Sequence, residues 1–189
     1  EHGAAAAVVA SLEAARADAQ RRLLETLESE RYVELLSALV TAANAPALRS
    51  RASAPAGDVV PALLRKPWHR LEKHVSSLGE SPTDDELHEA RIRAKRVRYA
   101  AEATAPVVGK PARSFARAAA GLQEVLGDLN DAVVAAGWLE TWADTGPDPA
   151  AVGTAQALAK LEREAAASLR SEWVSAWERL ALPELRSWM

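Results

Sequence analysis

Apolar residues recur along most of this chain at steps of three and four positions, which is the period of an α-helix with one buried face. No segment alternates with the period of two that a half-buried strand requires. In the last long segment, residues 150–180, the apolar residues are expected to lie along one side of a helix. This side consists of Leu158, Leu161, Ala165, Leu169, Trp173, Ala176 and Leu180. The pattern therefore predicts an all-α fold.

Prolines, glycines and capping residues divide the pattern into about five long helices joined by mostly short loops. We expect Asp58 to cap one helix, with Pro61 in its first turn. Thr83 and Glu86 form a capping-box pair that opens the next helix, and Pro106 is expected to end it. Such helices pack as antiparallel neighbours, so we expect one antiparallel bundle domain over residues 1–189. The expected helices are residues 4–29 (with or without a kinked continuation through 40), 58–78, 83–105, 111–143 and 150–180.

Composition excludes several kinds of chemistry. The chain has no cysteine, which rules out disulfides, thiolate zinc sites and cysteine nucleophiles. The four histidines lack the spacing of a helical metal pair, and no glycine-rich phosphate loop occurs. We therefore expect no metal, no cofactor and no catalysis. No apolar run has the length of a membrane span and the start lacks a basic signal region, so the expected compartment is the cytoplasm.

Positive charge gathers in one place although the chain is slightly acidic, with a net charge of −3. Five of the eight positions in 91–98 are Lys or Arg, and none is acidic. On a helix, residues three and four apart share a face, so one row forms there, which we call the basic ladder. Arg96 and Arg98 flank this row on opposite sides. The basic ladder consists of His88, Arg91, Lys95 and Tyr99.

A linear polyanion is the partner that this ladder suits. Like charges one helical turn apart repel each other, and an anion lying along the helix offsets that cost. Arginine offers forked donors to phosphate oxygens, whereas lysine offers a movable point charge. Lys66, Arg70 and Lys73 form a second basic stripe. Its helix is expected to pack beside the first, but the sequence does not determine whether the two stripes face one groove.

Other interpretations of the same residues stay open at this stage. One alternative is that the ladder is a solvated face whose charge is neutralised in part by acidic residues of the following helix. His88 is either a buried, hydrogen-bonded side chain or a ligand in a groove. The tryptophans sit at helical spacing and indicate core or interface packing. The acidic candidates are Glu124, Asp128 and Asp131.

Two segments resemble a known family. Residues 87–102, LHEARIRAKRVRYAAE, resemble the signature of the CHAD (conserved histidine α-helical domain) family, and 122–132, LQEVLGDLNDA, resemble its second marker. The resemblance implies two four-helix-bundle halves whose basic surfaces bind inorganic polyphosphate, and association with polyphosphate granules. Only one copy of the basic signature is present, so the chain resembles the second half of the domain. The first repeat is then expected before residue 1, or from a second copy of the chain.

The resemblance also implies which side chains hold the anion. They are His88, Arg91, Lys95, Arg96, Arg98 and Tyr99, while Glu102, Asp128 and Asp131 are expected to orient the cations. Lys66, Arg70 and Lys73 are added from their shared helix face. The predicted function is non-enzymatic polyphosphate binding. The alternatives are a general nucleic-acid binder, which the lack of interleaved aromatic residues and the negative net charge disfavour, and a helical scaffold that binds a protein.

Overall fold

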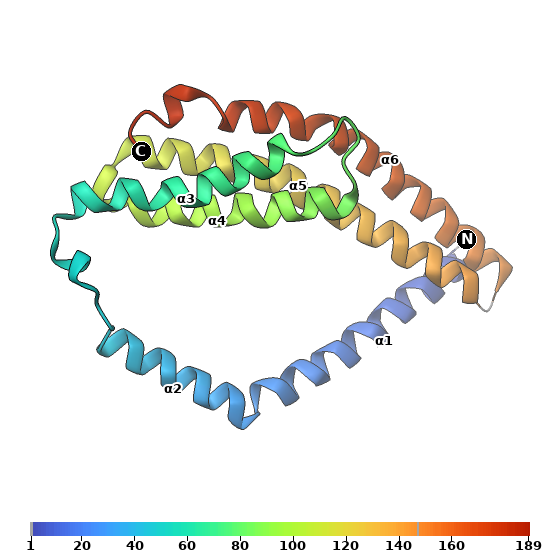
Figure 1. The fold of residues 1–189 in the computed structure, drawn as a ribbon. Helices are drawn as coiled ribbons and strands as arrows, with labels where there is room; N and C mark the ends of the chain where they lie inside the picture. Colours follow the sequence, from blue (N-terminus) through green and yellow to red (C-terminus); the bar gives the residue numbers. More distant parts are fainter. Residues whose placement is uncertain (1, 147) are drawn as a thin grey trace. The chain divides into compact units, whose positions relative to one another are not determined.

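A computed structural model describes residues 2–146 and 148–189. In this described part of the chain all regular structure is helical, as Figure 1 shows, so the prediction of an all-α fold of antiparallel helices is confirmed. The α-helices are α1 (His2–Leu27), α2 (Glu30–Asn44), α3 (Ala56–Ser76), α4 (Asp84–Val108), α5 (Lys110–Thr145) and α6 (Pro149–Leu180). Two 3-10 turns, η1 (Ser50–Ser53) and η2 (Pro183–Leu185), accompany them.

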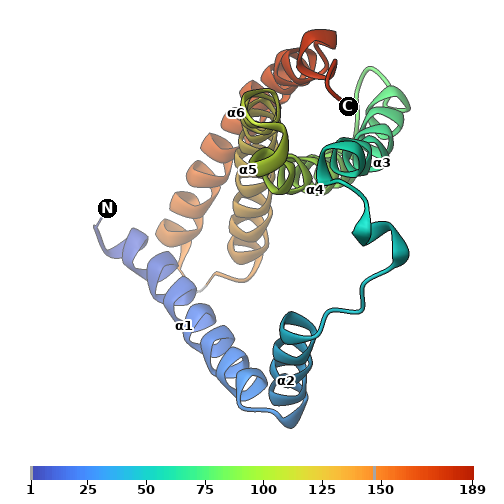
Figure 2. The same ribbon diagram turned by 90° about the vertical axis from the view of Figure 1, so that its left-hand side faces the viewer.

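The helices divide into two compact units. The bundle unit comprises Ala54–Thr141 and Ala157–Met189, and thus holds α3, α4, most of α5 and most of α6. The N-terminal unit comprises the chain before Ala54 together with Trp142–Gln156. Within the bundle unit α4 lies beside α3 in both ribbon views (Figures 1 and 2). The basic helix and the second basic stripe are therefore neighbours, as the short turn between them suggested.

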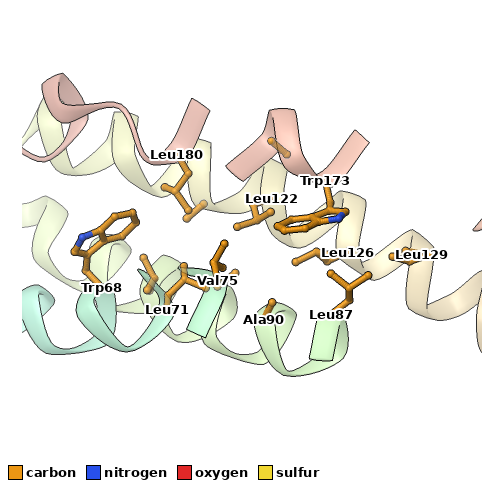
Figure 3. Packing of buried hydrophobic residues seen from close by; sticks show 14 of the residues in the cluster. Trp68, Leu71, Val75, Leu87, Ala90, Leu122, Leu126, Leu129, Trp173 and Leu180 are labelled. Atoms are coloured by element: carbon orange, nitrogen blue, oxygen red, sulfur yellow. The ribbon is translucent and has the colours of Figure 1, made fainter. Parts of the chain in front are cut away.

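The bundle core is built from one apolar face of each of its four helices. Five apolar positions at helical spacing form the buried inner face of α4, and Leu64, Trp68, Leu71 and Val75 of α3 belong to the same cluster. Figure 3 shows how these side chains meet leucines of α5 and Trp173 and Leu180 of α6. The buried α4 positions are Leu87, Ala90, Ala94, Val97 and Ala101. Because three of them are alanine, little side-chain bulk separates α4 from its neighbours.

An aromatic cluster closes the end of the bundle that holds Trp68. The indole of Trp68 stacks on Trp177 of α6 with ring centroids 5.4 Å apart and planes at 8°. Phe115 of α5 meets Trp68 edge-on at 5.7 Å, and Trp188 meets Phe115 at 6.3 Å. Trp188 is half-buried, and its indole N–H donates to the carbonyl of Leu185. These contacts join three helices to the C-terminal tail.

Several helix boundaries differ from the sequence prediction. The first helix does not continue through residue 40, because Ser29 caps a separate helix, α2, by accepting a hydrogen bond from Tyr32 N–H. Asp58 is not a cap: α3 begins at Ala56 after Pro55, and Asp58 lies in its first turn. Pro106 does not end α4, which runs on to Val108 and stops at Gly109, where φ is +85°. Such a positive φ favours glycine.

The apolar side predicted for α6 is half wrong. Trp173, Ala176 and Leu180 are buried as expected, but Leu158 and Leu161 are 39% and 60% exposed, and Ala165 is exposed as well. The buried positions of the first part of α6 are alanines instead, at 151, 155, 159 and 166. Small side chains let backbones approach closely, so in this part of α6 an alanine row is buried in place of the leucine row.

The N-terminal unit buries little apolar surface. Its buried apolar side chains include Val8 of α1, which is 3% exposed, and Ala151 and Ala155 at the start of α6, which are fully buried. None of the residues of α2 is buried, although Val33, Leu36 and Val40 recur on one side of it. That residues 1–189 form one domain stays a prediction.

Candidate functional site

The signature helix α4 begins at the predicted capping box. Thr83 N–H donates to Glu86 Oε2 at 2.8 Å, and Glu86 N–H donates to the Thr83 hydroxyl at 3.3 Å. The backbone and the hydroxyl of Thr83 hold the pKa of Glu86 below its ordinary value. The cap fixes where the helix starts, and the buried alanine-rich face fixes its rotation. His88, Lys95 and Tyr99 of the basic ladder are consequently exposed, and Arg91 is half-buried.

His88 is held by α5 through its inner ring nitrogen. Its Nδ1 lies 2.7 Å from Asn130 Oδ1, and the Asn130 amide N–H donates to Asp131 Oδ1 at 3.4 Å. With this amide orientation the carbonyl oxygen of Asn130 accepts, so Nδ1 of His88 carries the proton. The other ring nitrogen, Nε2, then donates to an anion only in the protonated imidazolium form. His88 is exposed and hydrogen-bonded, so the alternative of a buried side chain is wrong, and its role as a ligand in a groove stays a prediction.

Arg91 lies across α5 at a glycine. A Cβ placed on Gly127 would be in ordinary van der Waals contact with Arg91 Nε, at 3.5 Å, so the arginine side chain lies against this position of α5. In the part of the chain that the structure describes, this Nε is buried without a hydrogen-bond partner. The side chain is thus positioned by packing against α5, and no carboxylate of the described residues pairs with it.

Arg98, which flanks the basic ladder near Tyr99, contacts three neighbouring side chains. Its Nε donates to Glu102 Oε1 at 2.7 Å, which raises the pKa of the guanidinium, and its Nη1 donates to Gln123 Oε1 at 3.3 Å. The Tyr99 ring lies between two cations, with Arg98 Cζ at 5.6 Å and Lys95 Nζ at 5.7 Å from its centroid. Both separations are within cation–π range. Glu102 therefore orients a cation, as predicted.

The second marker and the signature meet along the α4–α5 seam. Gln123, Gly127 and Asn130 follow each other at steps of four and three on one side of α5, opposite Arg98, Arg91 and His88. None of the three α5 residues was predicted as part of the site. Each of the three is polar or small and directly follows a leucine of the buried face of α5, and this pattern is the sequence feature that could have identified them. Asp131 acts only through Asn130, and no ion pair or hydrogen bond of Asp128 to the ladder is among the described contacts.

The predicted cations are only partly neutralised. Among the residues that the structure describes, Arg91, Lys95 and Arg96 have no carboxylate within 4.0 Å, whereas Arg98 pairs with Glu102 and Arg93 pairs with Glu89 at 2.8 Å. Glu124, Asp128 and Asp131 do not form ion pairs with the ladder in this part of the chain. The interpretation of a solvated face neutralised by these residues therefore does not fit this geometry.

The second basic stripe lies on the other side of α4. Arg70 of α3 shares a small hollow with Pro67, Arg93 and Arg96. Arg96 thus approaches α3, whereas Arg91 and Arg98 approach α5. Lys66 and Lys73 are exposed and share the helix face of Arg70 by spacing. The structure brings together Arg70 and Arg96, but the α3 stripe does not border the α5 seam.

No group of three or more histidine and carboxylate side chains in residues 2–146 and 148–189 is arranged to hold a metal ion. None of the helices there combines the length and apolarity needed to cross a bilayer.

Comparison with known proteins agrees with the two motifs. The family model for the CHAD domain matches residues 1–140, which include α4 and the second marker. Two uncharacterized proteins of Mycobacterium tuberculosis, from strains CDC 1551 / Oshkosh and ATCC 25618 / H37Rv, are each 36% identical over 117 residues. That alignment covers 60% of this chain and 22% of each relative, so the chain spans under a quarter of their length. Since the family model covers well over half of the 189 residues, the chain belongs to the CHAD domain family.

Proposed function

We propose that the outer face of α4, with the α4–α5 seam, binds inorganic polyphosphate. The observation that supports this most directly is the row of cations without carboxylate partners at Arg91 and Lys95, in the described part of the chain. Successive turns of a helix rise about 5.4 Å, so the row offers one long donor side chain per turn to an extended anion. Membership of the CHAD family supports the same ligand.

The chemistry of each position fits a phosphoryl chain. Arg91 and Arg98 present planar forks that match pairs of phosphate oxygens, and Lys95 presents a movable ammonium group. His88 adds a donor at Nε2 when protonated, since Asn130 occupies Nδ1. Tyr99 holds the cationic tips of Lys95 and Arg98 beside its ring. Arg96, Arg70, Lys66 and Lys73 extend the positive surface toward α3.

The proposal is one of binding without catalysis, in which no residue acts as nucleophile or general base. A nucleic-acid ligand is the weaker alternative, because Tyr99 is the only aromatic residue within the basic row and base stacking on aromatic side chains dominates single-strand recognition. Association with polyphosphate granules in the cytoplasm would follow from the binding proposed here. A further basic repeat, or a second copy of this chain, would supply more cations to the same ligand.

The test compares a ladder variant with a charge-matched control. We expect Arg91→Ala with Lys95→Ala to weaken polyphosphate binding by more than tenfold in isothermal titration calorimetry. Each lost phosphate contact should lower the slope of log affinity against log salt by about one. Lys160→Ala with Arg179→Ala removes the same charge from exposed positions of α6 and should change neither quantity much.

Three results would contradict the proposal or a part of it. Unchanged affinity in the ladder variant would show that the row does not hold the ligand. DNA that displaces polyphosphate as readily as the reverse would favour the nucleic-acid alternative. Absence of phosphate release from polyphosphate or ATP in the presence of Mg²⁺ is expected, and turnover would refute the non-enzymatic part.

A further inference from the structure

The α4–α5 seam opens into a groove beyond the basic ladder. This groove has a volume of about 420 Å³ and lies between the second half of α4 and the first turns of α5. Its surface includes the small side chains of Ala105, Ala116 and Ala120. Neither the family signature nor the second marker includes its α5 residues.

Two arginines of α5 face this groove. Arg113 and Arg117 are one helical turn apart, both are exposed, and both line the groove together with Arg98. Arg117 Nη2 donates to the Ser114 hydroxyl at 3.3 Å, and neither arginine has a carboxylate within 4.0 Å among the described residues. The one carboxylate in the lining, Glu102, is already paired with Arg98 at 2.7 Å. The groove therefore carries an excess of positive charge.

Arg98 connects the groove to the ladder. Its guanidinium donates a hydrogen bond to Gln123 next to the ladder, and the same side chain lines the groove. Going along the seam from His88, the cationic groups come in the order Arg91, Arg98, and then Arg117 and Arg113 on the opposite helix. From His88 to Ala105, α4 rises about 26 Å at about 1.5 Å per residue. An anion must be long and linear to contact both ends of such a row.

We infer that Arg113 and Arg117 form a second contact region of the polyphosphate site, which makes the site selective for long chains over short ones. This inference rests on the proposed function. A short oligophosphate satisfies the ladder alone, whereas a long chain continues past Arg98 into the alanine-lined groove. The second region then adds affinity only for ligands that reach it, as linked binding events do.

The experiment measures two ligands against matched variants. Binding of tripolyphosphate and of long-chain polyphosphate is measured by calorimetry with the full chain, with Arg113→Ala/Arg117→Ala, with Arg113→Lys/Arg117→Lys, and with the α6 control Lys160→Ala/Arg179→Ala. We expect the alanine pair to weaken long-chain binding roughly tenfold and to lower its salt slope by about two. Tripolyphosphate binding should change by less than about twofold, and the lysine pair should retain most long-chain affinity. Circular dichroism checks that the variants fold. We expect them to fold because the replaced side chains are exposed.

Each other outcome has a definite meaning. If long-chain binding is unchanged in the alanine pair while wild-type protein binds both ligands, the inference is wrong and the proposed function stands. If both ligands weaken equally, the groove is part of the primary site and the length selectivity is wrong. If wild-type protein binds neither ligand, the proposed function fails and the inference fails with it.

Discussion

Replacing Gly127 with alanine should stabilise the bundle unit, although the glycine lies against a site residue. In a helix interior, alanine is favoured over glycine by about 1 kcal/mol. The added Cβ would lie 3.5 Å from Arg91 Nε, an ordinary van der Waals separation, so no steric cost offsets that gain. For a chain of this size, 1 kcal/mol corresponds to a rise of roughly 2–4 °C in Tm.

Gly146 provides the opposite case for comparison. A Cβ there would lie 2.7 Å from Val152 Cγ2 and 3.2 Å from Trp142 Cζ3, which is too close without local movement. Gly146→Ala should therefore destabilise the N-terminal unit. Thermal and urea unfolding followed by circular dichroism measure both variants. Tryptophan fluorescence adds resolution, because Trp142 belongs to the N-terminal unit and the other five tryptophans belong to the bundle unit.

A larger side chain at the same position tests the link to binding. Gly127→Leu extends beyond Cβ into the space of the Arg91 side chain and should displace it, so polyphosphate affinity should fall while α5 stays helical. Gly127→Ala should bind nearly as wild type. A loss of stability in Gly127→Ala, or full affinity in Gly127→Leu, would refute the position assigned to Arg91 over α5.

The remaining predictions concern the core, the helix cap and the support of His88. Trp68→Ala should cost about 3–5 kcal/mol in urea unfolding, because the indole is 3% exposed and packs on two aromatic rings; a cost below 1 kcal/mol would contradict the packing. The lowered pKa of Glu86 means that its carboxylate stabilises the folded state above its ordinary value of 4.5 and loses this effect as the pH falls through the folded-state value. Glu86→Gln should thus flatten the acid limb of stability against pH, and an unchanged limb would argue against the cap. Asn130→Ala removes an acceptor worth about 1 kcal/mol and should lower polyphosphate affinity roughly fivefold, with little change in Tm. Unchanged affinity would show that orienting His88 does not matter.

The sequence predicted the bundle helices well where the apolar residues were large or the cap was explicit. The capping box of Thr83 and Glu86 is present, and the predicted large apolar residues Trp173 and Leu180 of α6 are buried. Errors arose where two competing patterns coexisted. In α6 a leucine row and an alanine row occupy different faces, and the propensity of leucine for burial favoured the wrong one at Leu158 and Leu161. Periodicity alone cannot tell which row a close-packed neighbour will select.

The helical character of the chain and the row of cations on α4 follow from the sequence alone, because spacing along a helix is a local property. The two motifs that resemble the CHAD family are also visible in the sequence. The tertiary structure was needed to show which helix borders which side of the row. It placed Asn130, Gly127 and Gln123 against His88, Arg91 and Arg98, and it turned Arg96 toward Arg70. Contacts between residues tens of positions apart depend on how buried faces pack and how far each helix is rotated. A local pattern shows which face of one helix is apolar, but it does not show which neighbouring helix covers that face.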